Sequence, residues 1–342
     1  MKKVLLIIIT PCILLAQNAT IETLMHDNIE RSYILYVPSS YDGTNSVPLV
    51  LNLHGYTSNA GEQMIYSKFY EIADVEGFIL IHPEGTANDF GLQFWNIADF
   101  SEIDDVGFLS ALIDAISDEY NINTDRVYSM GMSNGGFMSY RLACELSDKI
   151  TAIASVTGSM LTDQIMSCSP SRPVPVMQIH GTADQTVLYE GETLTGILSI
   201  DDVVSYWVSF NNCSSEAILS IIPDNNTFDL STVEHYVYDG GNNDSSVEFY
   251  KIINGGHTWP GAAIPIAGNN TNQDFNASQA IWAFFNQYNI NGLIENNSNI
   301  QDWETKKKKL KSIDILGKEN TNKGFQLHIY DDGSVEKKYV IK

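Results

Sequence analysis

The sequence predicts an α/β fold, in which a mostly parallel sheet is covered by helices on both faces. Short, almost continuous apolar runs are typical of buried parallel strands, and four of them occur at residues 47–53, 78–82, 150–156 and 174–180. Helical patterns lie between and after them, at about 61–75 and 104–120. Because strands and helices alternate, we expect ligands to bind beyond the C-terminal ends of the strands.

The edges of the predicted sheet are less regular. Residues 31–37 alternate between polar and apolar side chains and stop at Pro38, which suggests an early, partly exposed strand. Val247–Ile253 is the last apolar run of the main body, and a helix is expected after it at about 278–288. A chain of 342 residues with 44% hydrophobic residues can bury the core of one large domain or two ordinary ones.

A nucleophilic serine is predicted at Ser133. An apolar strand that begins at Val127 runs into Gly131-Met132-Ser133-Asn134-Gly135 and then into a helix at 137–146. In a G-x-S-x-G turn the serine sits on a sharp, strained bend, and the two glycines let neighbouring backbone approach without a Cβ clash. The short pattern is weak alone, because glycine and serine are common, but its strand–turn–helix context supports the prediction.

A base and an acid for this serine follow it in the order Ser, Asp, His. Asp184 lies four residues beyond an apolar strand, and His257 lies in a glycine-rich loop after the last main-body strand. A single Asp or His on a loop is more often a solvated or capping residue, so the order of the three carries the argument. The alternatives to His257 are His26, His54, His82, His180, His235 and His328. His257 is preferred because it follows Asp184 on such a loop, whereas His235 lies in an alternating run and His328 in the tail.

Acyl transfer also needs donors for the oxyanion of the tetrahedral intermediate. We expect these to be the backbone N–H groups of Asn134, directly after the serine, and of Tyr56, after His54 and Gly55. Two further residues, Trp95 and Trp259, are candidates for aromatic walls around the substrate. Packing in the core or in a loop explains both tryptophans equally well.

Residues 101–108 contain an acidic pair, Asp104 and Asp105, that invites a metal or acid–base role. A helix that starts with a Ser-x-x-Asp cap at Ser101 is the simpler explanation. No histidine accompanies the pair in the sequence, so we expect neither a metal nor another cofactor.

Residues 1–16 are predicted to be a secretory signal peptide, cut near Ala16–Gln17, because two lysines precede a short apolar run. A membrane anchor is the alternative, but the run is short for a spanning helix and contains Pro11. Export removes Cys12 and leaves three cysteines, Cys144, Cys168 and Cys213. An oxidising compartment then permits one disulfide and one free thiol, and the spacings do not say which two pair.

Charge divides the chain into two parts. Residues 17–300 carry seven basic side chains against 35 acidic ones, whereas residues 301–342 carry ten lysines against seven acids. A strongly acidic surface repels phosphate backbones and anionic polymers. A role in nucleic-acid binding is therefore disfavoured, and a neutral or cationic substrate is favoured.

The C-terminal part is predicted to be a separate, small β unit. We divide the chain into a catalytic domain at 17–290, a polar linker at 291–305 and a β tail at 306–342. The tail alternates at 310–316, 325–330 and 335–341, and Asp332-Gly333 supplies a hairpin turn between the last two runs.

Seven short motifs between about residues 30 and 290 carry a family resemblance: LHGYTS, HPEG, WN at 95–96, DDVGF, GMSNGG, HGTADQTV and GGHTWPG. In these motifs the chain resembles the secreted polyhydroxybutyrate depolymerase and feruloyl esterase family, a branch of the α/β-hydrolases. The resemblance implies an α/β-hydrolase fold, a Ser133–Asp184–His257 triad and activity on short-acyl or aromatic esters. Many relatives have a second cysteine where this chain has residues 236–239, so the resemblance also implies that Cys213 lacks its usual partner.

The tail, in residues 314–319 and 329–338, resembles a C-terminal sorting domain of the Bacteroidetes type IX secretion system. That resemblance implies secretion machinery as a partner, passage through the periplasm, and release or attachment at the cell surface.

The function expected from these features is a secreted serine esterase that works through an acyl-enzyme. Its substrates are expected to be feruloyl or acetyl esters of neutral polysaccharides, or polyhydroxybutyrate-type polyester oligomers. The alternatives are a serine peptidase of the same fold and a catalytically silent surface binding protein. A peptidase would usually need an added propeller or cap, and no 40–50-residue repeat is visible. The acyl preference, the oligomeric state and a lid in the long interval from Asp184 to His257 stay open.

Overall fold

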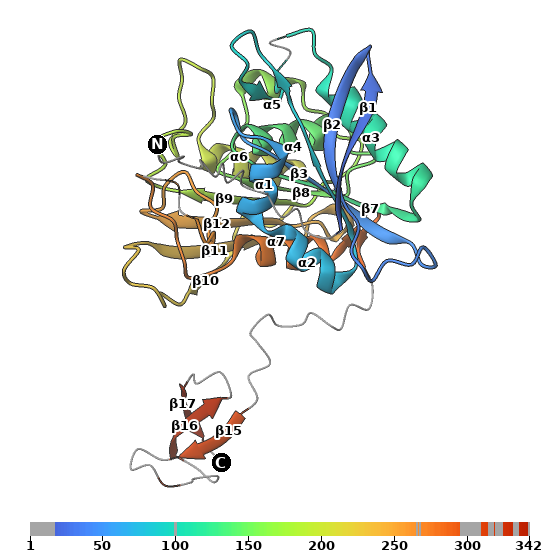
Figure 1. Cartoon of the computed structure of the whole chain (residues 1–342). Helices are drawn as coiled ribbons and strands as arrows, with labels where there is room; N and C mark the ends of the chain where they lie inside the picture. The colour runs from blue at the N-terminus through green and yellow to red at the C-terminus, as the bar shows by residue number, and fades with distance from the viewer. Residues whose placement is uncertain are drawn as a thin grey trace, which may run out of the picture. The chain divides into compact units, whose positions relative to one another are not determined.

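The structure is a computed structural model that describes residues 18–98, 101–264, 266, 268–294, 309–313, 318, 324–330 and 335–340. The chain divides into two compact units, Met1–Ile294 and Glu295–Lys342, which are described separately below (Figure 1). The predicted signal peptide and most of the predicted linker lie outside the described residues.

The first unit is built on a ten-stranded sheet with the order β1-β2-β4-β3-β7-β8-β9-β12-β11-β10. Its strands are β1 (Ala19–His26), β2 (Ile29–Tyr36), β3 (Val47–Leu53), β4 (Ile79–Pro83), β7 (Ile122–Met132), β8 (Ala152–Val156), β9 (Val176–Gly181), β10 (Ile218–Ile222), β11 (Thr232–Tyr238) and β12 (Val247–Ile253). The six strands from β4 to β12 pair in parallel, and the strands added at either end pair antiparallel. The prediction of a mostly parallel sheet is confirmed.

Helices cover both faces of this sheet, as predicted (Figure 1). They are α1 (Ala60–Ser67), α2 (Phe69–Glu76), α3 (Asp105–Glu119), α4 (Asn134–Glu145), α5 (Thr162–Ser167), α6 (Ile200–Phe210) and α7 (Ala277–Phe285). Successive side chains of a strand point to opposite faces, so Leu49 and Leu51 enter one hydrophobic cluster and Val50 enters the other. The first cluster packs against α3, α4 and α6, and the second against α1, α2 and α7.

Two helix predictions need correction. The helix expected at 61–75 is two helices, because Lys68 adopts a left-handed conformation with φ of 50° that ends α1 and precedes α2. The cap expected at Ser101 is wrong, since α3 is capped by Asp104, whose side chain accepts a hydrogen bond from the amide of Gly107. Strands β1, β10 and β11 and helices α5 and α6 were not predicted.

Short elements complete the first unit. They are the hairpin of β5 (Thr86–Ala87) and β6 (Gln93–Phe94), the 3-10 turn Asn242–Asp244, and the hairpin of β13 (Tyr288–Asn289) and β14 (Gly292–Leu293). The last hairpin extends the first unit to Ile294, beyond the boundary expected at 290. Within the part of the chain that the structure describes, no helix combines the length and apolar character needed to cross a membrane.

The second unit contains an antiparallel sheet of three strands, β15 (Lys309–Ile313), β16 (Gly324–Tyr330) and β17 (Val335–Val340). These strands overlap the three alternating runs of the tail. The turn predicted at Asp332-Gly333 lies outside the described residues.

The cysteine pairing that the spacings left open is Cys144 with Cys168. Cys144 lies near the end of α4, and Cys168 follows the last residue of α5. Cys213 is a free, half-buried thiol, and burial raises its pKa.

A buried ion pair joins β2 to the start of α3. The Arg31 guanidinium donates to Asp105 Oδ1 at 2.7 Å, and the two side chains are 3% and 0% exposed. Asp105 Oδ2 also accepts a hydrogen bond from the amide of Asn96, and the guanidinium lies 4.0 Å from the ring centroid of Phe108. Asp104 therefore caps a helix and Asp105 forms a buried ion pair, so both residues of the acidic pair have a structural role.

We expect Arg31→Met to lower the free energy of unfolding by about 3–5 kcal/mol, because it leaves the Asp105 carboxylate buried without its cation. Urea unfolding at pH 7 measures the change. The double variant Arg31→Met/Asp105→Leu should recover part of the loss, since it removes both buried charges. A single variant as stable as the natural protein would contradict this account of the pair.

Candidate functional site

The turn that carries Ser133 depends on its glycines. Ser133 follows β7 directly and has φ of 54° and ψ of −120°, a strained conformation for a residue with a side chain. A Cβ at Gly131 would lie 2.5 Å from the carbonyl carbon of Gly135, and one at Gly135 would lie 2.2 Å from the carbonyl oxygen of Leu53. Only glycine fits at either position, and the turn presents Ser133 at the end of the sheet.

Asp184 and His257 lie at the same edge of the sheet as Ser133. The three residues follow the ends of β9, β12 and β7, respectively, and these strands run parallel. The Nδ1–H of His257 donates to Asp184 Oδ2 at 2.7 Å. Asp184 Oδ1 accepts from the amides of Thr186 and Val187, at 2.8 and 2.9 Å. The carboxylate is fully buried, so these donors replace water and fix its orientation.

Ser133 and His257 line one pocket with a volume of about 420 Å³. Most of its wall is apolar and comes from α1, the end of β7 and two loops: Tyr56, Ile65, Tyr66, Met132, Ile264 and Ile266. Among the described residues of the lining, Glu62 alone carries a carboxylate, and none is a lysine or arginine. The geometry thus places a hydroxyl and an imidazole, which is held by a carboxylate, beside a cavity suited to an uncharged, partly apolar group.

The loop after β3 lies against Ser133. A Cβ at Gly55 would be 3.4 Å from Ser133 Cβ, and Tyr56 lines the same pocket. His54 anchors this loop, since its Nδ1–H donates to the carbonyl of Gly55 at 2.8 Å and its Nε2 accepts from the amide of Gly85 at 2.9 Å. Burial lowers the pKa of His54 to about 4, so the imidazole is neutral at physiological pH and can make both contacts.

Trp95 is buried in the core and does not line the pocket, contrary to its role as a candidate wall. Its indole N–H donates to the carbonyl of His54 at 3.0 Å. Its backbone N–H donates to Asn134 Oδ1 at 2.6 Å, and its carbonyl accepts from Asn134 Nδ2 at 3.1 Å. Trp95 therefore ties the loop of Gly55 and Tyr56 to the residue after Ser133.

Trp259 is also a buried anchor and not a wall of the pocket, with an exposed fraction of 1%. Its amide donates to the Tyr66 hydroxyl at 3.0 Å, and its indole N–H donates to Ser278 Oγ at 3.0 Å. These contacts hold the loop of His257 against α1 and α7. Tyr66, Ile264 and Ile266, which do line the pocket, carry no sequence signal apart from their apolar character.

The remaining described histidines have other surroundings. His82 is fully buried, and burial lowers its pKa to about 3. His235 contacts the carboxylate of Glu248 at 2.9 Å and stacks on Tyr250. His180 is buried and lies 3.4 Å from Asp184 Oδ2 through its Nε2, a contact that the sequence did not indicate.

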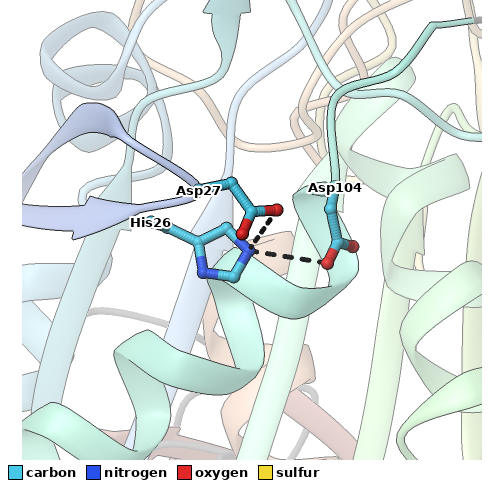
Figure 2. A group of neighbouring side chains, drawn as sticks. All are labelled: His26, Asp27 and Asp104. Atoms are coloured by element: carbon cyan, nitrogen blue, oxygen red, sulfur yellow. Dashed lines mark ion pairs between the residues drawn. The ribbon is translucent and has the colours of Figure 1, made fainter.

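A second group of acidic side chains lies around His26, away from the pocket lining (Figure 2). His26 Nε2 is 3.7 Å from Asp27 Oδ2 and 3.5 Å from Asp104 Oδ2. The other oxygen of Asp104 caps α3, and the positive end of that helix disfavours a cation here. The helix cap and the contacts of His26 with the two carboxylates account for the group, and we assign no metal to it.

The chain is similar to several known esterases. A bifunctional acetylxylan esterase/xylanase from Neocallimastix patriciarum is 28% identical over 269 residues, which cover 79% of this chain and 35% of that protein. Feruloyl esterase B from Piromyces equi is 28% identical over 196 residues, which cover 54% of this chain and 36% of that protein. The chain thus spans about a third of the length of these relatives.

The fold has a counterpart among solved structures. Acetyl xylan esterase from Aspergillus awamori matches with a TM-score of 0.56 at 13% identity, over 78% of this chain and 99% of that chain. At this identity the match shows the fold alone, which is that of an α/β-hydrolase. Residues 31–192 also match the family model described as Esterase PHB depolymerase. Residues 31–192, just under half of the chain, are therefore similar to the Esterase PHB depolymerase family.

Proposed function

We propose that the protein is a serine carboxylic-ester hydrolase that works through an acyl-enzyme. The observation that carries the proposal is the 2.7 Å hydrogen bond from His257 to Asp184 beside a pocket that Ser133 also lines. A serine hydroxyl becomes an effective nucleophile only when an oriented base takes its proton. The family domain and the esterase relatives support the same reaction class.

In the proposed reaction Ser133 Oγ attacks the ester carbonyl carbon while His257 Nε2 takes the hydroxyl proton. The Nδ1–H of His257 keeps its proton and stays hydrogen-bonded to Asp184, whose negative charge stabilises the imidazolium. His257 then gives the proton to the leaving alcohol. In the second half the same imidazole takes a proton from water, and the water oxygen attacks the acyl carbon. The imidazolium then returns this proton to Ser133 Oγ as the bond between that oxygen and the acyl carbon breaks and the acid leaves.

The oxyanion would be held by two backbone amides, those of Tyr56 and Asn134. Asn134 is the first residue of α4, where an amide has no acceptor within its own helix. Tyr56 follows Gly55, whose backbone lies against Ser133. The Trp95 side chain and backbone bridge the two elements, so this residue would set the spacing between the donors.

We further propose neutral esters as substrates, either feruloyl or acetyl esters of polysaccharides or hydroxybutyrate-type polyester oligomers. The apolar pocket wall and the acidic surface support an uncharged acyl group. The names of the relatives, acetylxylan esterase and feruloyl esterase, favour the polysaccharide esters.

The proposed site of action is outside the cytoplasm, either in solution or at the cell surface. The Cys144–Cys168 disulfide supports this location, because disulfides persist in oxidising compartments. The signal-peptide pattern of residues 1–16 and the basic β tail support export through a sorting system.

Ser133→Ala should lower kcat on p-nitrophenyl acetate by about 10⁴-fold or more, because no other group replaces the nucleophile. Labelling with a fluorophosphonate probe should disappear in the same variant. Circular dichroism checks that the fold persists. Activity at the level of the natural protein would reject the serine mechanism.

Trp95→Phe should lower kcat by about 10-fold or more with little change in KM, since the carbonyl of His54 loses its donor and the oxyanion loop shifts. Steady-state kinetics on p-nitrophenyl acetate measures both constants. Trp282→Phe is the matched control, because that buried indole has no hydrogen-bond partner among the described residues. Equal effects of the two substitutions would argue against the bridge.

Substrate class is tested with methyl ferulate, acetylated xylan and hydroxybutyrate oligomers. We expect turnover of the first two, and slower turnover of oligomers with a free terminal carboxylate than of their methyl esters, because the described lining of the pocket holds no lysine or arginine to pair with an anion. Chromatography of the released acids gives the rates. If none of the three is hydrolysed while p-nitrophenyl acetate is, the substrate proposal fails but the serine mechanism does not.

A further inference from the structure

His180 is a fully buried titratable residue that takes no part in the reaction as written above. It lies in β9, four residues before Asp184, and belongs to a chain of buried polar groups that begins at Tyr140. The Tyr140 hydroxyl donates to Gln178 Oε1 at 2.7 Å, and Gln178 Nε2 lies 3.0 Å from His180 Nδ1. This series of hydrogen bonds ends at the turn that holds Asp184.

The contacts determine which nitrogen of His180 carries the proton. Gln178 Nε2 lies 2.8 Å from the carbonyl oxygen of Gly158, which can only accept, so the amide orientation is settled. The amide nitrogen can only donate, and His180 Nδ1 must therefore accept. The proton of the neutral ring is then on Nε2. Burial lowers the pKa of His180, which keeps the ring neutral.

The Nε2–H of His180 points at the turn of Asp184. It donates to the carbonyl of Val187 at 2.8 Å, and Asp184 Oδ2 lies 3.4 Å away. Val187 is thus held at both ends, since its own amide donates to Asp184 Oδ1 at 2.9 Å. His180 and Asp184 therefore hold Val187 from both sides, and these contacts fix the carboxylate that faces His257.

We propose that His180 is a positioning residue for Asp184: its neutral Nε2–H holds the carbonyl of Val187 and thereby orients the carboxylate toward His257 Nδ1. The inference rests on the proposed function, because it gives the carboxylate its role in orienting the base. A shift of about 1 Å in a group that orients the base is enough to slow the chemical step strongly.

Burial lowers the pKa of His180 more than the Asp184 carboxylate and the carbonyls of Val187 and Gly158 raise it, so the imidazole is neutral. Gln178 and the Val187 carbonyl occupy its two nitrogens, and the ring of Tyr189 lies edge-on at 6.3 Å between centroids. Asp184 is the charged group in contact, and its Oδ2 is shared with His257. A protonated His180 would set Nδ1–H against the amide donor of Gln178 and would draw Oδ2 away from His257.

The test uses two substitutions of His180, one that keeps a donor near the position of Nε2 and one that does not. In His180→Gln the side-chain amide nitrogen can reach about the position of Nε2 and donate to Val187. In His180→Asn it reaches only about the position of Nδ1, so the carbonyl of Val187 loses its donor. We expect His180→Asn to lower kcat by about 10- to 100-fold with KM nearly unchanged, and His180→Gln to keep kcat within about threefold of the natural protein.

Tyr140→Phe is the matched control, because it removes the buried hydroxyl at the far end of the same series of hydrogen bonds. It should lower the melting temperature and leave kcat unchanged. The proposal is overturned if Tyr140→Phe loses as much kcat as His180→Asn, if His180→Gln loses as much as His180→Asn, or if His180→Asn keeps the natural kcat. Ser133→Ala is measured beside them: activity in that variant rejects the proposed function itself, whatever His180 does.

A spectroscopic measurement keeps the proposal testable if His180→Asn fails to fold. Nitrogen-15 NMR of the full chain, with Ser133→Ala to prevent turnover, reports the tautomer of each imidazole. We expect His180 to be neutral at pH 7, with its proton on Nε2, because burial lowers its pKa. A proton on Nδ1, or a charged ring at that pH, would overturn the assignment.

Discussion

Close backbone contact between the Ser133 turn and the end of β3 is the constraint on which the site depends. Gly135 approaches the carbonyl oxygen of Leu53 so closely that no side chain fits between them. Because β3 and β7 are neighbouring parallel strands, the loops that follow them leave the sheet side by side. Gly55 consequently meets Ser133, and the pocket opens between these loops and α1. Any larger residue at Gly135 would separate the two halves of the proposed oxyanion site.

Parallel strands bring loops to one edge, but they do not fix where each loop goes. That task falls to buried side chains that bond to backbone groups, since loop backbone has few regular partners. His54 and Trp95 do this for the loop after β3, and Asp184 and His180 do it for the loop after β9. In both loops an uncharged imidazole works as a structural connector, which is possible because burial keeps the ring neutral.

Local patterns in the sequence predicted the parallel strands, the Ser133 turn and the order of Ser133, Asp184 and His257. The outer strands escaped prediction because β1 and β10 are largely exposed and lack the apolar pattern of buried strands. The two tryptophans could not be assigned, since a large aromatic side chain fits a pocket wall and a core equally well. The Cys144–Cys168 pairing and the contact of His180 with Asp184 depend on how α4, α5 and β9 pack in space.

The pocket wall and the proposed catalytic trio belong to different parts of the fold. Ser133, Asp184 and His257 follow strand ends, whereas Glu62, Ile65 and Tyr66 lie on α1, and Ile264 and Ile266 lie on a loop beyond His257. Ile65 and Ile264 are 48% and 64% exposed, so replacing them disturbs little of the core. Natural selection can therefore retune the choice of ester at these positions while the reacting groups keep their arrangement, and one scaffold can diverge into enzymes for different esters.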